Sequence, residues 1–143
     1  MRIMGIDYGD SRVGIALSDP LGYMAQGYKT IPNKVYDKMM DSVISIIGEY
    51  DVSTVVLGMP KNLNGTLGFR ADITKEFAAD LLARKQGIDI VFQDDRLTTV
   101  EASVFLNATN TRGKSRKNVI DTVAAEIILQ SYLDSNANKK GEI

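Results

Sequence analysis

Apolar and polar positions alternate along the first third of the chain in a way that predicts β-strands. Three short apolar runs cover residues 3–8, 13–17 and 27–31, and the turn-forming segments 9–11 and 19–22 separate them. Runs of this length with such short connections predict a meander of three antiparallel strands.

The apolar period then lengthens to that of a helix. Two stretches show helical spacing, and two short apolar runs, residues 54–58 and 88–92, predict a fourth and a fifth strand. Pro60 ends the first of these strands, and the helical stretches end near Gly48 and Gly87. The apolar positions of the two helices are Val35, Met39, Val43, Ile46 and Ile47, and then Phe69, Ile73, Phe77, Leu81 and Leu82.

The last third of the chain predicts two more helices. Residues 98–101, Thr-Thr-Val-Glu, form a capping box that opens a short helix, and residues 108–115 form a polar loop. Residues 117–133 are apolar on most sides, which predicts a buried helix. We expect one domain over residues 1–134 and a flexible polar tail over residues 135–143.

The predicted order of elements is three strands, then alternating helices and strands, then two helices. Alternation in the second half implies parallel strands with right-handed crossovers. The prediction is therefore an α/β protein with a mixed sheet, three antiparallel strands followed by two parallel ones, and helices on both faces. This is the order of the ribonuclease H-like fold.

Composition narrows the possible chemistry. The chain has 143 residues, 17 Lys and Arg, 18 Asp and Glu, a formal net charge of −1, and no Cys or His. Thiolate and imidazole chemistry are therefore excluded, and a bound metal would have only oxygen ligands, which favours Mg²⁺ or Mn²⁺. No signal peptide and no membrane span are readable, so we expect a cytoplasmic protein.

Carboxylates fall at three informative places. Asp7 lies near the end of the first strand, Asp94 and Asp95 follow the fifth, and Asp121 lies on the face of the last helix that carries Ala124 and Ala125. Each also has a purely structural interpretation. Asp7 could cap a turn, Asp94 and Asp95 could belong to a solvated turn, and Asp121 could stabilise the helix dipole. Together they can converge on one point and hold one or two ions that support phosphodiester hydrolysis. Adjacent residues on a strand face opposite sides, so Asp94 and Asp95 are alternatives.

Several polar and basic residues are candidates for holding a nucleic-acid backbone. The glycine-rich loop over residues 58–68 and the basic segment over residues 112–117 flank the predicted carboxylates, although turn-rich and solvated segments can look the same. The candidate substrate-binding residues are Arg12, Asn62, Asn64, Arg70, Arg96, Arg112, Lys114, Arg116 and Lys117.

Four segments in series resemble the motifs of the YqgF family. The first is Gly5-Ile6-Asp7-Tyr8-Gly9 with Arg12-Val13-Gly14-Ile15-Ala16 and Ser18-Asp19, and the second is Gly58-Met59-Pro60 with Asn64-Gly65. The third and fourth are Asp94-Asp95-Arg96-Leu97-Thr98-Thr99 with Glu101-Ala102, and Asp121 with Ala124-Ala125 and Leu129-Gln130. They cover nearly the whole chain in the family's order.

The resemblance implies a ribonuclease H-like nuclease, related to RuvC-type Holliday junction resolvases, that trims the 5′ end of pre-16S ribosomal RNA. By motif position, Asp7, Asp95 and Asp121 would be the catalytic, metal-binding carboxylates. The family has Glu where this chain has Asp95, which keeps the charge and shortens the side chain. The implied partners are pre-rRNA in a ribosome precursor, or branched DNA, with no membrane. The oligomeric state is left open, and a dimer is one option.

Three alternatives to this function remain. The same carboxylates could cut four-way DNA junctions, or the chain could be a non-catalytic nucleic-acid-binding module of ribosome assembly. The segment around Asp7 also resembles the phosphate-binding opening of actin-like ATPases. Those proteins close two such domains on ATP, and 143 residues supply only one.

Overall fold

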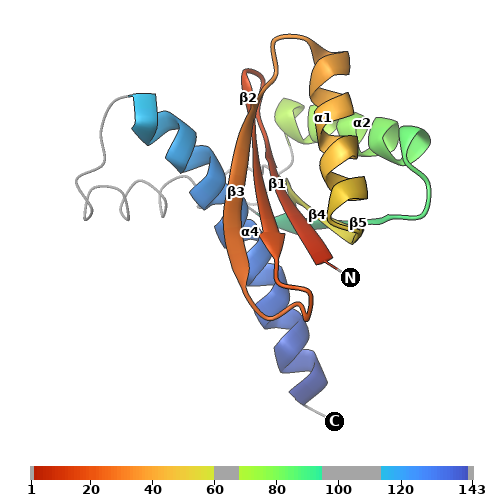
Figure 1. The fold of residues 1–143 in the computed structure, drawn as a ribbon, viewed down its shortest axis with the longest axis vertical. Coiled ribbons are helices and arrows are strands. Elements are labelled where there is room, and N and C mark those ends of the chain that lie inside the picture. The colour runs from red at the N-terminus through yellow and green to blue at the C-terminus, as the bar shows by residue number, and fades with distance from the viewer. Residues whose placement is uncertain (1, 60–67, 95–113, 142–143) are drawn as a thin grey trace.

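The computed structural model describes residues 2–59, 68–94 and 114–141, and within them a five-stranded sheet lies between helices (Figure 1). The strands are β1 (Arg2–Tyr8), β2 (Arg12–Ser18), β3 (Ala25–Pro32), β4 (Val52–Met59) and β5 (Asp89–Asp94). The helices are α1 (Tyr36–Glu49), α2 (Phe69–Arg84) and α4 (Lys114–Gly141).

The sheet has the order β3-β2-β1-β4-β5, which confirms the predicted mixed topology. β2 pairs antiparallel with both β1 and β3, whereas β4 runs parallel to β1 and to β5. β1 is therefore the central strand, and its carboxyl end lies beside those of β4 and β5. Ligands of open α/β sheets gather at this edge.

The helices cover opposite faces of the sheet. α1 and α2 lie on one face and α4 crosses the other (Figure 1). Met4 and Ile6 of β1 are fully buried in the core beneath α1 and α2, while Ala125 and Leu129 of α4 are fully buried with Val56 of β4 in a second core. Alternate residues of each strand thus supply two separate cores, as the two-residue period of a strand requires.

The sequence located α1 and α2 correctly but misplaced part of their apolar faces. Val35 precedes α1 and is 51% exposed, because it is the residue before the first helical turn. Phe69 and Leu82 of α2 are also exposed. Phe77 and Leu81 face the sheet as predicted, and smaller residues complete the buried stripe of α2 at helical spacing: Ala71, Thr74 and Ala78.

α4 is longer at both ends than the pattern indicates. It begins at Lys114, so the expected polar loop does not extend to residue 115, and it continues to Gly141 rather than ending at residue 133. Its polar last turns contain no Pro, which would end the helix. The boundary between a domain and a flexible tail stays a prediction, and the short helix expected from residue 98 lies outside the described residues. No helix in the described parts of the chain is long and apolar enough to span a membrane.

The turn between β2 and β3 is organised by the carboxylate of Asp19. This carboxylate accepts hydrogen bonds from the backbone N–H groups of Met24 and Tyr23, both at 2.8 Å, and of Leu21 at 3.2 Å. These bonds, that of Met24 foremost, hold the pKa of Asp19 below its ordinary value, although partial desolvation opposes them. Charged Asp19 therefore stabilises the folded state above the ordinary Asp pKa of about 3.9, and this contribution is lost as pH falls through the lower folded-state pKa.

We expect Asp19→Asn to destabilise the protein at neutral pH, because the amide offers the turn only one neutral acceptor oxygen. Since protonation removes the same charge from the wild type, the difference between the two proteins should shrink at about pH 2. Urea unfolding followed by circular dichroism at both pH values measures this difference. Asp41→Asn, on the exposed side of α1, is the matched control. A difference that stays constant or grows at low pH would contradict the expectation.

Candidate active site

Asp7 faces α4 from the carboxyl end of the central strand. Its cross-strand partner in β2 is Gly14, and directly paired residues of antiparallel strands project to the same face. Gly5, two residues before Asp7 on the same face, lies so close to α4 that an added Cβ would be 2.8 Å from the carbonyl oxygen of Ala125. Asp7 is half-buried and takes part in at least one polar or electrostatic interaction.

Asp121 reaches the same place from α4. A Cβ added to Gly14 would lie 3.1 Å from the Cβ of Asp121 and would overlap its backbone carbonyl oxygen. Ala124 and Ala125, one turn further along α4, are almost completely buried. The predicted close approach of this helix to the sheet is confirmed, and the absence of a side chain at Gly14 makes room for it.

The geometry brings Asp7 and Asp121 together across Gly14. Cβ positions of directly paired strand residues are about 5 Å apart, so the Cβ atoms of the two aspartates are separated by at most about 9 Å. Two Asp side chains can bridge such a gap through one ion, because each Mg²⁺–oxygen bond adds about 2.1 Å. The donors are oxygen atoms only and lie within reach of one ion, so the pair fits a hard divalent ion.

Arg12 forms an ion pair with Asp121. Its Nε donates to Oδ2 of Asp121 at 2.5 Å, and the two side chains are 41% and 14% exposed, respectively. Arg12 lies two residues before Gly14 on β2, so it projects to the α4 face. A residue predicted to bind substrate thus contacts a predicted metal ligand directly.

The third predicted carboxylate belongs to the segment at the end of β5. β5 ends at Asp94, whose backbone pairs with that of Met59 at the end of β4. Asp95 lies outside the described residues, as do Asn62, Asn64, Arg96 and Arg112. Within the described residues no group of three or more acidic side chains could hold a metal ion.

The other predicted substrate-binding cations in the described residues lie on α2 and α4. Arg70, in the first turn of α2, donates to Asp10 in the β1–β2 turn at 2.8 Å, and both side chains are largely exposed. This pair lies next to the carboxyl end of β1. Lys114, Arg116 and Lys117 belong to the first turn of α4, four residues or more before Asp121.

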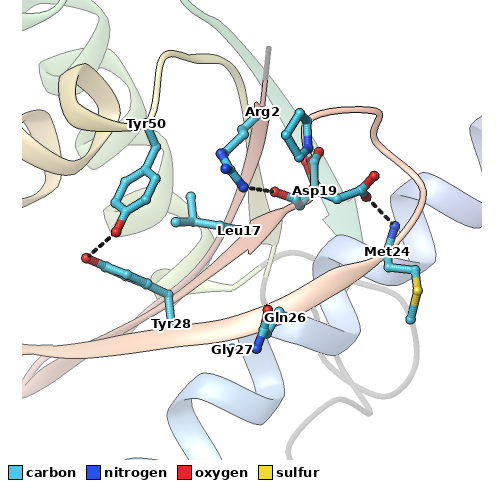
Figure 2. Close-up of a pocket in the computed structure, with 10 residues that line it drawn as sticks. Arg2, Leu17, Asp19, Met24, Gln26, Gly27, Tyr28 and Tyr50 are labelled. Carbon is cyan, nitrogen blue, oxygen red and sulfur yellow. Dashed lines mark hydrogen bonds between the residues drawn. The ribbon is translucent and has the colours of Figure 1, made fainter.

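A cavity of about 470 Å³ lies at the other end of the sheet. Figure 2 shows Arg2, Tyr28 and Tyr50 around it, with Arg2 bonded to the backbone of β2 and the two tyrosines bonded to each other. Arg2 and Asp7 are five residues apart on β1, which corresponds to about 16 Å along a strand. None of the described site residues lines this cavity, so it is separate from the candidate site.

Sequence reasoning missed two features of the site. Gly14 appeared there only as part of a motif, yet it is the point at which β1, β2 and α4 meet. Its pairing with Asp7 could have been inferred from the hairpin register, since only six residues lie between the two in a short hairpin. The contact between Arg12 and Asp121 has no local signal, because 109 positions separate these residues.

Comparison with protein families gives a match over residues 1–135 to the family model "RuvX: Holliday junction resolvase". A relative from Halothermothrix orenii is 46% identical over 134 residues, which cover 94% of this chain and 95% of the relative. A relative from Clostridium botulinum is 48% identical over 136 residues, covering 94% and 98%, respectively. Both carry the name "Putative pre-16S rRNA nuclease".

Two solved structures share the fold at low sequence identity. RuvC of Thermus thermophilus is 10% identical with a TM-score of 0.56, covering 96% of this chain and 97% of RuvC. The Fowlpox virus resolvase, in complex with substrate Holliday junction DNA, is 13% identical with a TM-score of 0.56, covering 94% and 98%. These likenesses confirm the ribonuclease H-like fold predicted from the order of elements.

Proposed function

Because the chain belongs to the RuvX family, which the sequence motifs identified under the name YqgF, we propose that it is a metal-dependent nuclease that processes the 5′ end of pre-16S rRNA. The observation that carries this proposal is the meeting of Asp7 and Asp121 across Gly14. A chain without His or Cys has few other means of phosphodiester hydrolysis. Two acidic side chains on one face of a central strand supply a site of the required type.

The residues proposed to hold Mg²⁺ or Mn²⁺ are Asp7, Asp121 and Asp95. When bound, such an ion neutralises negative charge that develops on the phosphate oxygens during hydrolysis. The chain itself orients two of the ligands, since the β1–β2 pairing fixes Asp7 and the packing of α4 on Gly14 fixes Asp121. Asp95 is included because its motif follows β5, which ends at the same edge of the sheet as β1.

The first turn of α4 supports binding of a polyanion. It carries Lys114, Arg116 and Lys117 and no acidic residue, although the positive end of a helix dipole disfavours cations by about 0.3–1 kcal/mol each. Phosphate groups at this end would offset both the dipole and the three charges. Arg70 and Arg12, together with the residues outside the described parts, are proposed to extend this surface.

Two substrates are compatible with the site. The names of the relatives favour pre-16S rRNA in a ribosome precursor, whereas the description of the family model favours a four-way DNA junction. We give precedence to the RNA, since the relatives that carry this name are 46% and 48% identical to this chain over nearly its whole length. The oligomeric state and the cytoplasmic location stay predictions.

A direct comparison of substrates tests the proposal. We expect the purified chain, with Mg²⁺ or Mn²⁺, to cut an RNA that carries the 5′ extension of 16S rRNA faster than a synthetic four-way DNA junction. Labelled fragments resolved on denaturing gels give both rates, and excess chelator is the control that should stop them. Faster cleavage of the junction would favour the resolvase alternative, and cleavage of neither substrate would contradict a nuclease.

A further inference from the structure

The ion pair between Arg12 and Asp121 joins two residues with different expected roles. Asp121 is the more buried partner, with 14% of its side chain exposed, whereas the guanidinium-bearing side chain of Arg12 is 41% exposed. The pair lies on the α4 face of β2, two residues from Gly14 and therefore beside Asp7. Arg12 is thus a cation at the point where two carboxylates approach each other.

A positive charge beside these carboxylates stabilises their close approach. Asp7 and Asp121 carry like charges on one face, and Asp121 is largely removed from water, so their repulsion is weakly screened. The guanidinium of Arg12 offsets that repulsion and fixes the orientation of Asp121. A nitrogen 2.5 Å from Oδ2 also occupies the space in which a cation would approach that oxygen.

Resting on the function proposed above, we propose that Arg12 is a positioning residue that orients Asp121 as a metal ligand and turns to a nucleic-acid phosphate when a divalent ion binds. A divalent ion at Asp121 weakens the contact of Arg12 with Oδ2, because two adjacent cations repel each other. Its exposed side chain can then reach outward, and a guanidinium matches the geometry of a phosphate. Metal binding and nucleic-acid binding are therefore coupled through one side chain.

The first test is metal affinity without nucleic acid. We expect Arg12→Gln to bind Mn²⁺ about fivefold more tightly than the wild type in calorimetric titrations, because the competing cation is gone. Arg12→Lys retains the positive charge, so its Mn²⁺ affinity should stay near that of the wild type. It is the second variant, because it tests the role of the charge without removing it from the fold. Arg84→Gln, which breaks an ion pair with Asp37 between α1 and α2, is the matched control and should not change the affinity.

The second test is the coupling itself. Fluorescence anisotropy of a labelled RNA measures nucleic-acid affinity with and without Ca²⁺, used here as an oxygen-ligated divalent ion. We expect Ca²⁺ to raise the affinity of the wild type about fivefold or more, and to raise that of Arg12→Gln much less. Equal Mn²⁺ affinity in the two proteins, or a gain with Ca²⁺ that Arg12→Gln retains, would overturn the role of Arg12 and leave the nuclease proposal standing. A wild type that binds no Mn²⁺ would overturn both.

Discussion

Asp7→Asn is expected to abolish phosphodiester cleavage while the protein stays folded. Asn keeps the size of the side chain and one oxygen, but it removes the negative charge that a divalent ion requires. Loss of a single group that stabilises charge in a transition state costs about 10²–10³ in rate, and a metal ligand should lie at or beyond the upper end of that range. Single-turnover cleavage of the 16S precursor RNA measures the effect, and thermal melting shows whether the fold is kept.

Asp37→Asn is the matched control, because it removes an exposed carboxylate of α1 on the opposite face of the sheet from α4. Its cleavage rate should equal that of the wild type. If Asp7→Asn cuts as fast as the wild type, Asp7 is not a catalytic ligand. If neither protein cuts but both bind the RNA equally, the chain acts as a binding module of ribosome assembly.

Most of the fold could be predicted from the sequence, because the spacing of apolar residues distinguishes strands from helices. The change from short apolar runs to helical spacing located every strand and helix in the described parts of the chain, and the short connections at 9–11 and 19–22 fixed the antiparallel half. The side of a helix that packs on the sheet was harder to predict. Phe69 and Leu82 are large and apolar yet exposed, whereas the small Ala71 and Ala78 are buried with Phe77 on the side of α2 that packs on the sheet.

The candidate site could be predicted only in part, because some of its contacts depend on how distant segments pack. Alternation along a strand places Asp7 on the face opposite Ile6, and helical spacing places Asp121 with Ala125, so the meeting of the two aspartates follows once α4 is known to cross that face. The partner of Arg12 does not follow in this way. Its choice of Asp121 depends on the exact depth at which α4 packs, which no local pattern encodes.

Because α4 packs directly on Gly14, we expect Gly14→Ala to lower both the stability of the protein and its cleavage rate. The new Cβ would lie 2.5 Å from the carbonyl carbon of Asp121 and would overlap the attached oxygen. Backbone atoms cannot rotate away as a side chain would, so α4 must move off the sheet. Overpacking of this kind costs about 1–3 kcal/mol of unfolding free energy. A shift of about 1 Å between the two carboxylates can also cost about 100-fold in cleavage rate.

Substitutions at two other glycines distinguish this steric overlap with α4 from the general effect of adding a methyl group. Gly48 of α1 has no neighbour within 4 Å of an added Cβ, so Gly48→Ala should stabilise the helix by about 0.5–1 kcal/mol and leave cleavage unchanged. Gly5→Ala meets Ala125 and Leu129 of α4, and should destabilise the protein through the same helix. Urea unfolding and the cleavage assay measure both properties. An unchanged unfolding midpoint for Gly14→Ala would mean that α4 is not held at this depth, and the argument that Asp7 and Asp121 share one ion would fail with it.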